Sequence, residues 1–305
     1  MNTPYFAIAT TTYNMADTIE RTYRSIVAQT YRNFYWLVID NGSTDNTKAV
    51  IEEIKNRNEI KVVYIYKNHG IRATAINTMI DNLEGDLCVE IHADDELLPN
   101  ALELFSNEWV KIKHPERYWN IVTHCADSEG NIVGKKFPNN INHNYKKAVH
   151  LSFHTIGEKH YAMNIALIKT VRFDLNIPDD VSYLSESLLW NDLNRKYITW
   201  FANTATRIYH NDSKNRYSQV SNNVSEIMRR NAYFSHMKIV NTFFLMDKTP
   251  RLDYLKNLVI AEHNAIIVGK SKSDILNDCY SIGSRKWIHL FWNPLRMYNW
   301  IKKRR

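Results

Sequence analysis

Cysteines are few in this sequence and long apolar runs are missing, and each absence excludes a class of protein. Cys88, Cys125 and Cys279 are widely spaced, which argues against a disulfide framework and against a zinc cluster. No apolar run is long enough to predict a membrane-spanning helix. The N-terminus enters an apolar strand pattern without a basic segment and a signal-like stretch, which argues against secretion. Together these absences predict a protein of the reducing cytoplasm.

The composition is that of a folded protein with an excess of positive charge. Hydrophobic residues make up 44% and charged residues 23% of the 305 residues, and no internal repeat is visible. This length predicts one large domain or two closely packed ones. The net charge of +7 suggests an acidic partner: nucleic acid, anionic lipid or a nucleotide-activated substrate. Much of the charge is concentrated in residues 284–305, which argues against nucleic acid as the partner.

Strand-like and helix-like segments alternate in the first hundred residues. Such alternation predicts an α/β fold with parallel strands joined by right-handed crossovers, in which ligands bind at the carboxyl ends of the strands. The predicted strands are 6–11, 35–40, 61–66 and 87–92, and the predicted helices are 17–29, 46–57 and 71–83. The rule on ligand position places a set of polar residues on one rim: Thr11, Tyr13, Asp40, Asn41, Asp94 and Asp95.

The regular alternation ends after residue 100. Pro99 can open a helix that extends to about His114. The elements expected next are a strand at 118–124, a hairpin turn at 126–133, a helix at 187–196 and strands at 197–202 and 205–209. From residue 220 onward the pattern predicts an all-helical extension. Four histidines match no zinc signature and are predicted to be ordinary surface and core residues: His143, His150, His154 and His160.

Two adjacent carboxylates, Asp94 and Asp95, follow the fourth predicted strand. Mg²⁺ and Mn²⁺ take hard oxygen ligands and usually keep positions open for a substrate's phosphates, so the pair indicates a divalent-cation site. The alternative is an acidic turn, since Asp and Glu favour the first turn of a helix. Both interpretations remain open for the motif alone.

Several sequence blocks of the N-terminal half resemble the inverting glycosyltransferases of family 2, which have the GT-A fold. The blocks are Thr11 to Asn14, Ser25 to Phe34, Ile39 to Thr47, Asn68 to Arg72, and the acidic run with Leu98 and Pro99. The resemblance is strong over residues 5–105 and looser over 160–210. It implies a Rossmann-like, mixed and mostly parallel sheet with flanking helices. It also implies a nucleotide-sugar-binding half at 1–100, an acceptor-binding half of the same domain at 101–215, and a helical extension with a basic aromatic tail at 216–305.

The resemblance implies a donor pocket on the rim. Thr11 and Tyr13 would shape the nucleotide pocket, and Tyr13 would stack on the base. Asp40 or Asn41 would hydrogen-bond the edge of the base, although Asn41 stands where the family usually has a second Asp. Arg72 would contact the diphosphate or the base, since its planar, permanently charged guanidinium suits phosphate. The alternative for Arg72 is a surface ion pair.

The resemblance also implies a cation, Mn²⁺ or Mg²⁺, at the acidic run. The family's motif is commonly Asp-x-Asp-Asp, and His92 occupies its first position here. Asp94 would then hold the ribose and share the cation with Asp95. His92, at strand spacing, is expected to point into the fold. His210 is expected to add a contact to the metal or the diphosphate.

A carboxylate base is required on the side of the sugar opposite the leaving group. The segment from Leu184 to Asn191 resembles the family's base-bearing block, so Glu186 is the predicted base. Ser187 stands where many relatives have Asp, and the reserves for the role are Asp179, Asp180 and Asp192. The alternative is structural, with Ser185 capping a helix and Glu186 in its first turn.

Residues 284–305 alternate aromatic or aliphatic side chains with basic ones. Tryptophan beside cationic residues is typical of a segment at a membrane–water interface, which suggests peripheral contact with an anionic membrane at the inner face of the cell membrane. The alternative is a C-terminal helix packed on the body of the protein. The sequence leaves both open.

The sequence therefore predicts a cytoplasmic, metal-dependent inverting hexosyltransferase. It would move a sugar from a nucleotide diphosphate, most simply UDP, to a hydroxyl of a glycan or lipid-linked acceptor in surface polysaccharide synthesis. Two alternatives are kept: a nucleotidyltransferase on a similar sheet, and a non-catalytic protein that binds nucleotide sugars or nucleic acid. The donor sugar, the acceptor and the oligomeric state are not predicted.

Overall fold

The structure is a computed structural model, and it describes residues 3–137, 157–179, 181–210, 226–244, 251–279 and 282–302. The chain divides into two compact units. One consists of Met1–Arg172 and Leu193–Arg216, and the other of Phe173–Asp192 and Tyr217–Arg305.

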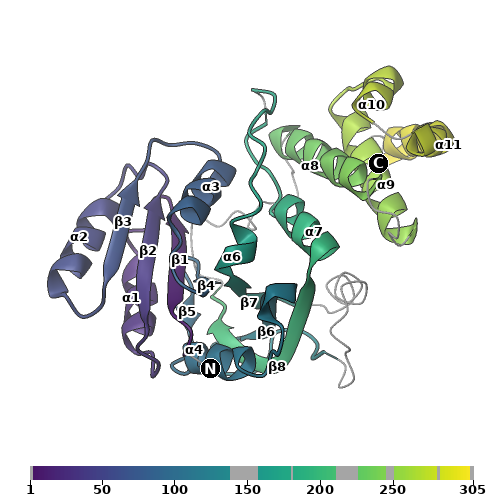
Figure 1. The fold of residues 1–305 in the computed structure, drawn as a ribbon. Coiled ribbons are helices and arrows are strands. Elements are labelled where there is room, and N and C mark those ends of the chain that lie inside the picture. Colours follow the sequence, from purple (N-terminus) through teal and green to yellow (C-terminus); the bar gives the residue numbers. More distant parts are fainter. Residues whose placement is uncertain are drawn as a thin grey trace. The chain divides into compact units, whose positions relative to one another are not determined.

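An eight-stranded sheet forms the first unit, in the order β3-β2-β1-β4-β7-β6-β8-β5 (Figure 1). Strands β1 to β4 pair in parallel, β6 and β8 are also parallel, and β7 and β5 pair antiparallel with their neighbours. The strands are β1 Phe6–Thr12, β2 Phe34–Asp40, β3 Val62–Tyr66, β4 Leu87–Glu90, β5 Glu96–Leu97, β6 Tyr118–Ala126, β7 Lys159–Asn164 and β8 Ile198–Ile208. This mixed, mostly parallel sheet with flanking helices confirms the predicted fold class.

The helices between the first four strands are those that the sequence predicts. They are α1 Ile19–Val27, α2 Thr47–Arg57 and α3 Arg72–Asn82. Every residue of β2 is buried, as expected for a parallel strand covered on both faces. Helix α1 buries Ile19, Tyr23 and Ile26, which recur at helical spacing, in the same core as β2.

Strand β4 ends at Glu90, two residues earlier than predicted. Ile91 N–H still bonds to the Ala9 carbonyl, but the chain then turns, and Asp95 N–H donates to the His92 carbonyl over 3.2 Å. The expectation that His92 points into the fold is therefore wrong. Its side chain is 43% exposed.

Two other boundaries differ from the prediction. Helix α4, Ala101–Trp109, ends five residues before His114. His114 precedes Pro115, and a residue before proline disfavours the α conformation; a short 3₁₀ turn, Pro115–Arg117, follows instead. The two strands expected at 197–202 and 205–209 form the single strand β8, with register irregularities against β6 where the break was expected.

Strand β7 was not predicted. It pairs with β4 on one side and β6 on the other, and His160 on it is buried, as expected for a core histidine. The other three histidines of that region lie outside the described residues. The turn at 126–133 is present, with one antiparallel bridge between Ala126 and Ile132.

The second unit is helical, as predicted for the C-terminal part. Its helices are α8 Glu226–Phe244, α9 Arg251–Ile267, α10 Lys272–Asp278 and α11 Ile282–Lys302. Their core includes Tyr233 and Val240 of α8, Leu258 of α9, and Ile288 and Trp292 of α11. None of the helices in the described part of the chain has the length and apolarity needed to cross a membrane.

Residues 173–192 group with these C-terminal helices rather than with the sheet. The backbone N–H groups of Ser182 and Tyr183 donate to Asn231 Oδ1 over 2.9 and 3.3 Å. The Ser185 N–H donates to Ser235 Oγ over 3.3 Å. These bonds tie the segment before α7, Ser187–Lys196, to helix α8.

Glu262 of α9 should make the stability of the helical unit depend on pH. Its side chain is buried, and neither carboxyl oxygen has a hydrogen-bond partner among the described residues. Burial raises the pKa of Glu262 from 4.5 to about 8, with Lys272 opposing the rise. The folded state then holds a proton that the unfolded state releases above pH 4.5, so the free energy of unfolding falls as pH rises from there to about 8.

The slope from this one group is at most ~1.4 kcal/mol per pH unit. We expect Glu262→Gln to remove it, so that the difference between variant and wild type grows in favour of the variant as pH rises. Urea denaturation at several pH values, with the exposed Glu53→Gln as the control, measures this. A constant difference between Glu262→Gln and wild type over that range would contradict a neutral buried Glu262.

Candidate active site

The carboxyl ends of β1, β2 and β4 meet at one edge of the sheet. The strands are parallel neighbours, with Thr12 beside Asp40 and Ala9 beside Glu90. The Asn41 N–H donates to the Thr12 carbonyl over 2.9 Å and joins the loops that follow β1 and β2. As the alternation predicts, the polar segments after these strands share this rim.

An aromatic pair lies beside these loops. Tyr13 is exposed, and its ring centroid is 4.3 Å from that of His69. His69 Nδ1 lies 3.0 Å from the Asn41 carbonyl oxygen, which fixes the ring as a donor at that nitrogen. The two rings are tilted by 36° to each other, and Tyr13 is 39% exposed, so part of its ring remains accessible. Thr11 lies at the end of β1, close to Tyr13 in the chain.

Asp40 and Asn41 are both buried and already engaged within the rim. Asp40 Oδ1 accepts the Ser43 N–H over 2.8 Å, and Oδ2 accepts the Tyr64 hydroxyl over 2.8 Å. Burial, then the Asp40 contact, raises the pKa of Tyr64. Asn41 Nδ2 donates to the Gly70 carbonyl over 2.7 Å. Their predicted contact with a base edge stays a prediction.

Lys67 is a rim residue that the sequence analysis missed. Its ammonium group donates to Asn41 Oδ1 over 2.8 Å, to the Asn68 carbonyl over 2.8 Å and to Thr74 Oγ1 over 2.9 Å. Burial lowers the pKa of Lys67. The replacement of the usual second Asp by Asn41 was the sequence signal for Lys67. A neutral amide can accept a hydrogen bond from a lysine and donate one to a backbone carbonyl at the same time.

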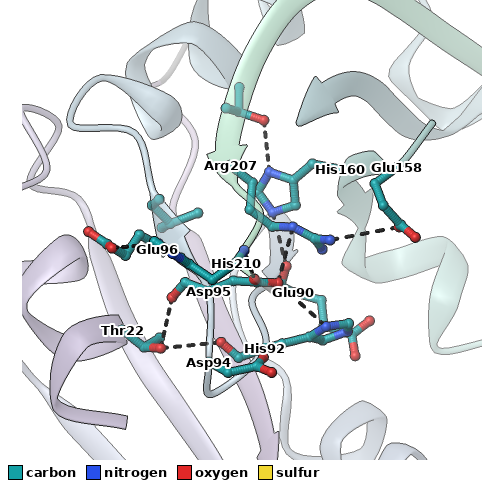
Figure 2. A network of polar contacts seen from close by, with 12 residues as sticks. Thr22, Glu90, His92, Asp94, Asp95, Glu96, Glu158, His160, Arg207 and His210 are labelled. Carbon is teal, nitrogen blue, oxygen red and sulfur yellow. Dashed lines mark hydrogen bonds and ion pairs between the residues drawn. The ribbon is translucent and has the colours of Figure 1, made fainter. Parts of the chain in front are cut away.

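The acidic run forms a compact group of possible metal ligands (Figure 2). One ligand atom from each of His92, Asp94 and Asp95 lies within 4.8 Å of the others. Asp95 is completely buried: its Oδ1 accepts the His210 N–H over 3.0 Å, and its Oδ2 lies 3.7 Å from His92 Nδ1. Two carboxylates and one imidazole suit a divalent cation.

Helix α1 fixes the shape of this turn. Thr22 Oγ1 donates to the Asp95 carbonyl over 2.8 Å and lies 3.3 Å from that of His92 (Figure 2). The Arg21 guanidinium donates to the Asp94 carbonyl. Helix α1 therefore holds the turn through its backbone carbonyls and leaves the side chains of Asp94 and Asp95 to other contacts.

Asp94 differs from Asp95 in its surroundings. It is only 6% exposed, yet its carboxylate has no hydrogen bond or ion pair with any described residue; only its backbone carbonyl is engaged. A carboxylate that no described residue engages keeps its oxygens available as ligands, and Asp95 and His92 lie beside it, so the residues present fit a cation.

Arg207 of β8 neutralises Asp95 from inside the fold. Its Nε lies 3.4 Å from Asp95 Oδ2, and its Nη2 lies 3.8 Å from Glu158, with the arginine side chain 6% exposed. Burial lowers the pKa of Arg207, but the acidic groups around it, which include Cys125 and Asp95, raise it overall, so it stays charged. The sequence analysis missed Arg207. The sequence signal for Arg207 was the presence of a charged residue within the predicted strand at 205–209.

His160 lies behind Arg207 and has a structural role. Its Nε2 is 3.0 Å from the Glu90 carbonyl oxygen and its Nδ1 is 2.7 Å from Thr206 Oγ1. Burial, and then the charge of Arg207, lowers the pKa of His160 to about 3. The neutral ring links β7 to the ends of β4 and β8, next to the acidic turn (Figure 2).

Arg72 and His210 lie at the acidic run, each with a carboxylate partner. Arg72 Nη2 is 3.1 Å from Glu90 Oε1 and 3.5 Å from His92 Nε2. The ion pair is the alternative that the sequence left open, and the guanidinium also lies at the group of possible ligands. His210 Nε2 is 2.7 Å from Glu96 Oε1. Their roles toward a diphosphate or metal stay predictions.

Glu186 belongs to the second unit and immediately precedes helix α7. Its carbonyl accepts the N–H groups of Leu189 and Trp190 over 2.9 and 3.1 Å, and its side chain is partly buried. The position is thus that of an N-cap, one residue before the first turn in which the structural alternative places Glu186, and the role as base stays a prediction. Of the three reserves, Asp180 lies outside the described residues.

Comparisons with known proteins identify the N-terminal part. The family model described as Glycosyl transferase family 2 matches residues 7–118. Glycosyltransferases from Rickettsia prowazekii and Rickettsia typhi, both uncharacterized, are 31% identical over 123 residues, which is 40% of this chain and 36% of theirs. The chain thus spans about a third of the length of these curated relatives. A putative teichuronic acid biosynthesis glycosyltransferase of Bacillus subtilis is 30% identical over 101 residues, 33% of this chain and 40% of that protein.

Solved structures share the fold over nearly the whole chain. TarS of S. aureus in complex with UDP-GlcNAc has a TM-score of 0.61 at 15% identity, covering 95% of this chain and 79% of that one. A mannosyltransferase from Pyrobaculum calidifontis in complex with GDP-Man and Mn²⁺ has a TM-score of 0.54 at 14% identity, covering 99% of this chain and 87% of that one. Residues 7–118 thus match the family 2 glycosyltransferases, and the chain shares the fold of these solved glycosyltransferase structures.

Proposed function

We propose that the protein is a metal-dependent inverting glycosyltransferase that moves a hexose-type sugar from a UDP-sugar to a hydroxyl of a glycan or lipid-linked acceptor in surface polysaccharide synthesis. The observation that carries the proposal is the group of His92, Asp94 and Asp95 on the rim where parallel strands end. The name of the Bacillus relative supports the acceptor class, and the UDP-GlcNAc bound by TarS supports the donor class.

The donor nucleotide would lie on the rim. The exposed Tyr13 would stack on the base beside His69, and Thr11 would line the pocket. Asp40 and Asn41 would meet the base edge, with Lys67 holding the Asn41 side chain in place. Arg72 would contact the diphosphate from its position beside Glu90 and His92.

The cation would be held by Asp94 and Asp95, with His92 as a third ligand and His210 nearby. The bound cation supplies Lewis-acid stabilisation of the leaving diphosphate. Imidazole is a better ligand for Mn²⁺ than for Mg²⁺, which prefers an all-oxygen shell. We therefore expect Mn²⁺ to be the more effective ion, as His92 replaces the carboxylate usual at its position.

Glu186 would take the proton of the acceptor hydroxyl as it attacks the anomeric carbon from the side opposite the diphosphate. General-base assistance of this kind is worth ~10²–10⁴ in rate. The three cysteines are buried and free, which supports a reducing cytoplasmic compartment for the reaction.

A donor screen tests this function. We expect thermal stabilisation by a UDP-sugar with Mn²⁺, weaker stabilisation with Mg²⁺, none with the donor alone, and slow metal-dependent release of UDP. Stabilisation without any turnover on lipid-linked or glycan acceptors would favour the non-catalytic binding protein. A metal-independent preference for nucleoside triphosphates would favour a nucleotidyltransferase.

Gly42 should be essential for the shape of the donor pocket. Its φ is +82°, and a Cβ there would lie 2.5 Å from the His69 backbone nitrogen. Gly130 has nearly the same φ, +85°, but a Cβ there would meet no atom within 4 Å. Left-handed backbone costs an L-residue ~1–2 kcal/mol by itself.

We expect Gly130→Ala to lose about that much stability and keep donor affinity. Gly42→Ala should lose more stability and weaken donor binding at least ~10-fold, because His69 must move away from Tyr13. Urea denaturation and calorimetric titration with the donor measure the two effects. Equal losses of stability and equal donor affinities in the two variants would show that the Tyr13–His69 pair is not part of the donor pocket.

A further inference from the structure

Helix α11 has one face buried in the helical unit. Ile288, Trp292 and Asn299 are buried, and the first two belong to the core shared with α8 and α9. Their spacing of four and seven residues places them on one side of the helix. This face accounts for the packing of α11 on the body of the protein, which was one of the two alternatives for the tail.

A second apolar stripe on the same helix remains exposed. Trp287 is 40% exposed, Leu290 58%, Met297 63% and Tyr298 54%. At 100° per residue these positions lie on the side of the helix roughly opposite the buried face. Trp287 also stacks on Phe291, with ring centroids 5.7 Å apart. Packing on the body therefore leaves an aromatic and aliphatic stripe uncovered.

The charge around this stripe has one sign. Residues 282–305 contain no Asp or Glu, whereas α8, α9 and α10 each contain at least one. Lys286 and Arg296 of α11 are exposed, and the sequence continues into Lys302, Lys303, Arg304 and Arg305. The exposed Lys286 and Arg296 thus belong to the same helix as the stripe, and no acidic residue of that helix compensates their charge.

We propose that α11 docks on an anionic membrane surface through Trp287, Leu290, Met297 and Tyr298. Aromatic and aliphatic side chains enter the boundary between headgroups and acyl chains, and the neighbouring basic side chains meet anionic headgroups. Nucleic acid would leave Leu290 and Met297 without an apolar partner. A second copy of the chain would bring two cationic helices together, which repel each other.

This inference does not rest on the proposed function, because its test does not measure turnover. Full-length protein is sedimented with vesicles of phosphatidylglycerol and phosphatidylcholine, and with vesicles of phosphatidylcholine alone. We expect binding to the anionic vesicles and at least tenfold weaker binding to the neutral ones.

Three variants and a matched control identify the surface. Lys286→Gln with Arg296→Gln should weaken binding about thirtyfold, since each basic residue near the membrane contributes the equivalent of about fivefold. Lys135→Gln with Lys136→Gln removes the same charge from exposed positions of the other unit and should leave binding unchanged. Trp287→Ser with Leu290→Ser should abolish binding, although it also removes the stacking of Trp287 on Phe291. Leu290→Ser with Met297→Ser, at the two most exposed positions, should weaken binding while the thermal unfolding midpoint stays that of wild type.

Three results would overturn the proposal. They are absence of wild-type binding to anionic vesicles, equal weakening by the control pair, and retained binding by the Trp287→Ser, Leu290→Ser variant. Light scattering tests the remaining alternative, in which a second copy of the chain covers the stripe. A wild-type dimer that this variant makes monomeric would assign the stripe to a second copy of the chain.

Discussion

Replacing Glu186 with Gln is expected to lower kcat by ~10²–10⁴ while the donor still binds with its normal affinity. The amide keeps the size of the side chain but cannot accept the proton of the acceptor hydroxyl. The carbonyl of Glu186, which receives the first N–H groups of α7, is unchanged by the substitution, so the start of the helix is preserved. The loss should therefore appear in the chemical step alone.

Steady-state assays and donor titrations separate the two quantities. Asp179→Asn is the matched control, because it removes a carboxylate from the same unit and should keep full turnover. Unchanged kcat in Glu186→Gln, with loss in Asp179→Asn or in Asp192→Asn, would move the role of base to that residue.

Asp94→Asn should remove cation binding without disturbing the fold. The Asp94 carboxylate has no partner among the described residues, so its replacement breaks no interaction within the described part of the chain. We expect Mn²⁺ affinity to fall by more than the ~10–100-fold that the loss of an outer-shell partner costs, and kcat/KM to fall with it. The unfolding midpoint of the metal-free protein should not decrease.

Asp95→Asn is the informative contrast. Asp95 is fully buried against Arg207, which would keep its charge and lose the closer of its two carboxylate partners. Breaking a buried pair in this way costs ~3–5 kcal/mol, so this variant should lose stability as well as Mn²⁺ binding. Calorimetric Mn²⁺ titration and urea denaturation of both variants measure the difference. Destabilised Asp94→Asn with intact Mn²⁺ binding would contradict the assignment of its carboxylate to a cation.

Much of the N-terminal fold follows from local sequence patterns. The four parallel strands are short apolar runs, the intervening helices carry apolar residues at helical spacing, and the carboxyl-end rule then brings Tyr13, Asn41 and Asp94 to one rim. These inferences need only neighbouring residues and the handedness of crossovers. The helical C-terminal unit was predictable for the same reason.

What the sequence did not disclose depends on contacts between distant segments. Arg207 meets Asp95 only because β8 and β5 pair, and Lys67 meets Asn41 because β3 lies beside β2. The orientation of His92 follows from the turn that Thr22 stabilises, 70 residues away. Strand β7 is specified by its two neighbours rather than by its own composition. Pairwise tertiary contacts of this kind are not readable from periodicity.

The central claim is that the carboxylates after β4 hold a divalent cation that carries the donor diphosphate. Crystals grown with Mn²⁺ and UDP, measured at the manganese absorption edge, test it directly. The account predicts an anomalous peak in contact with a carboxylate oxygen of Asp94 or Asp95 and with the UDP phosphates. Bound UDP with no anomalous peak at these residues would contradict it.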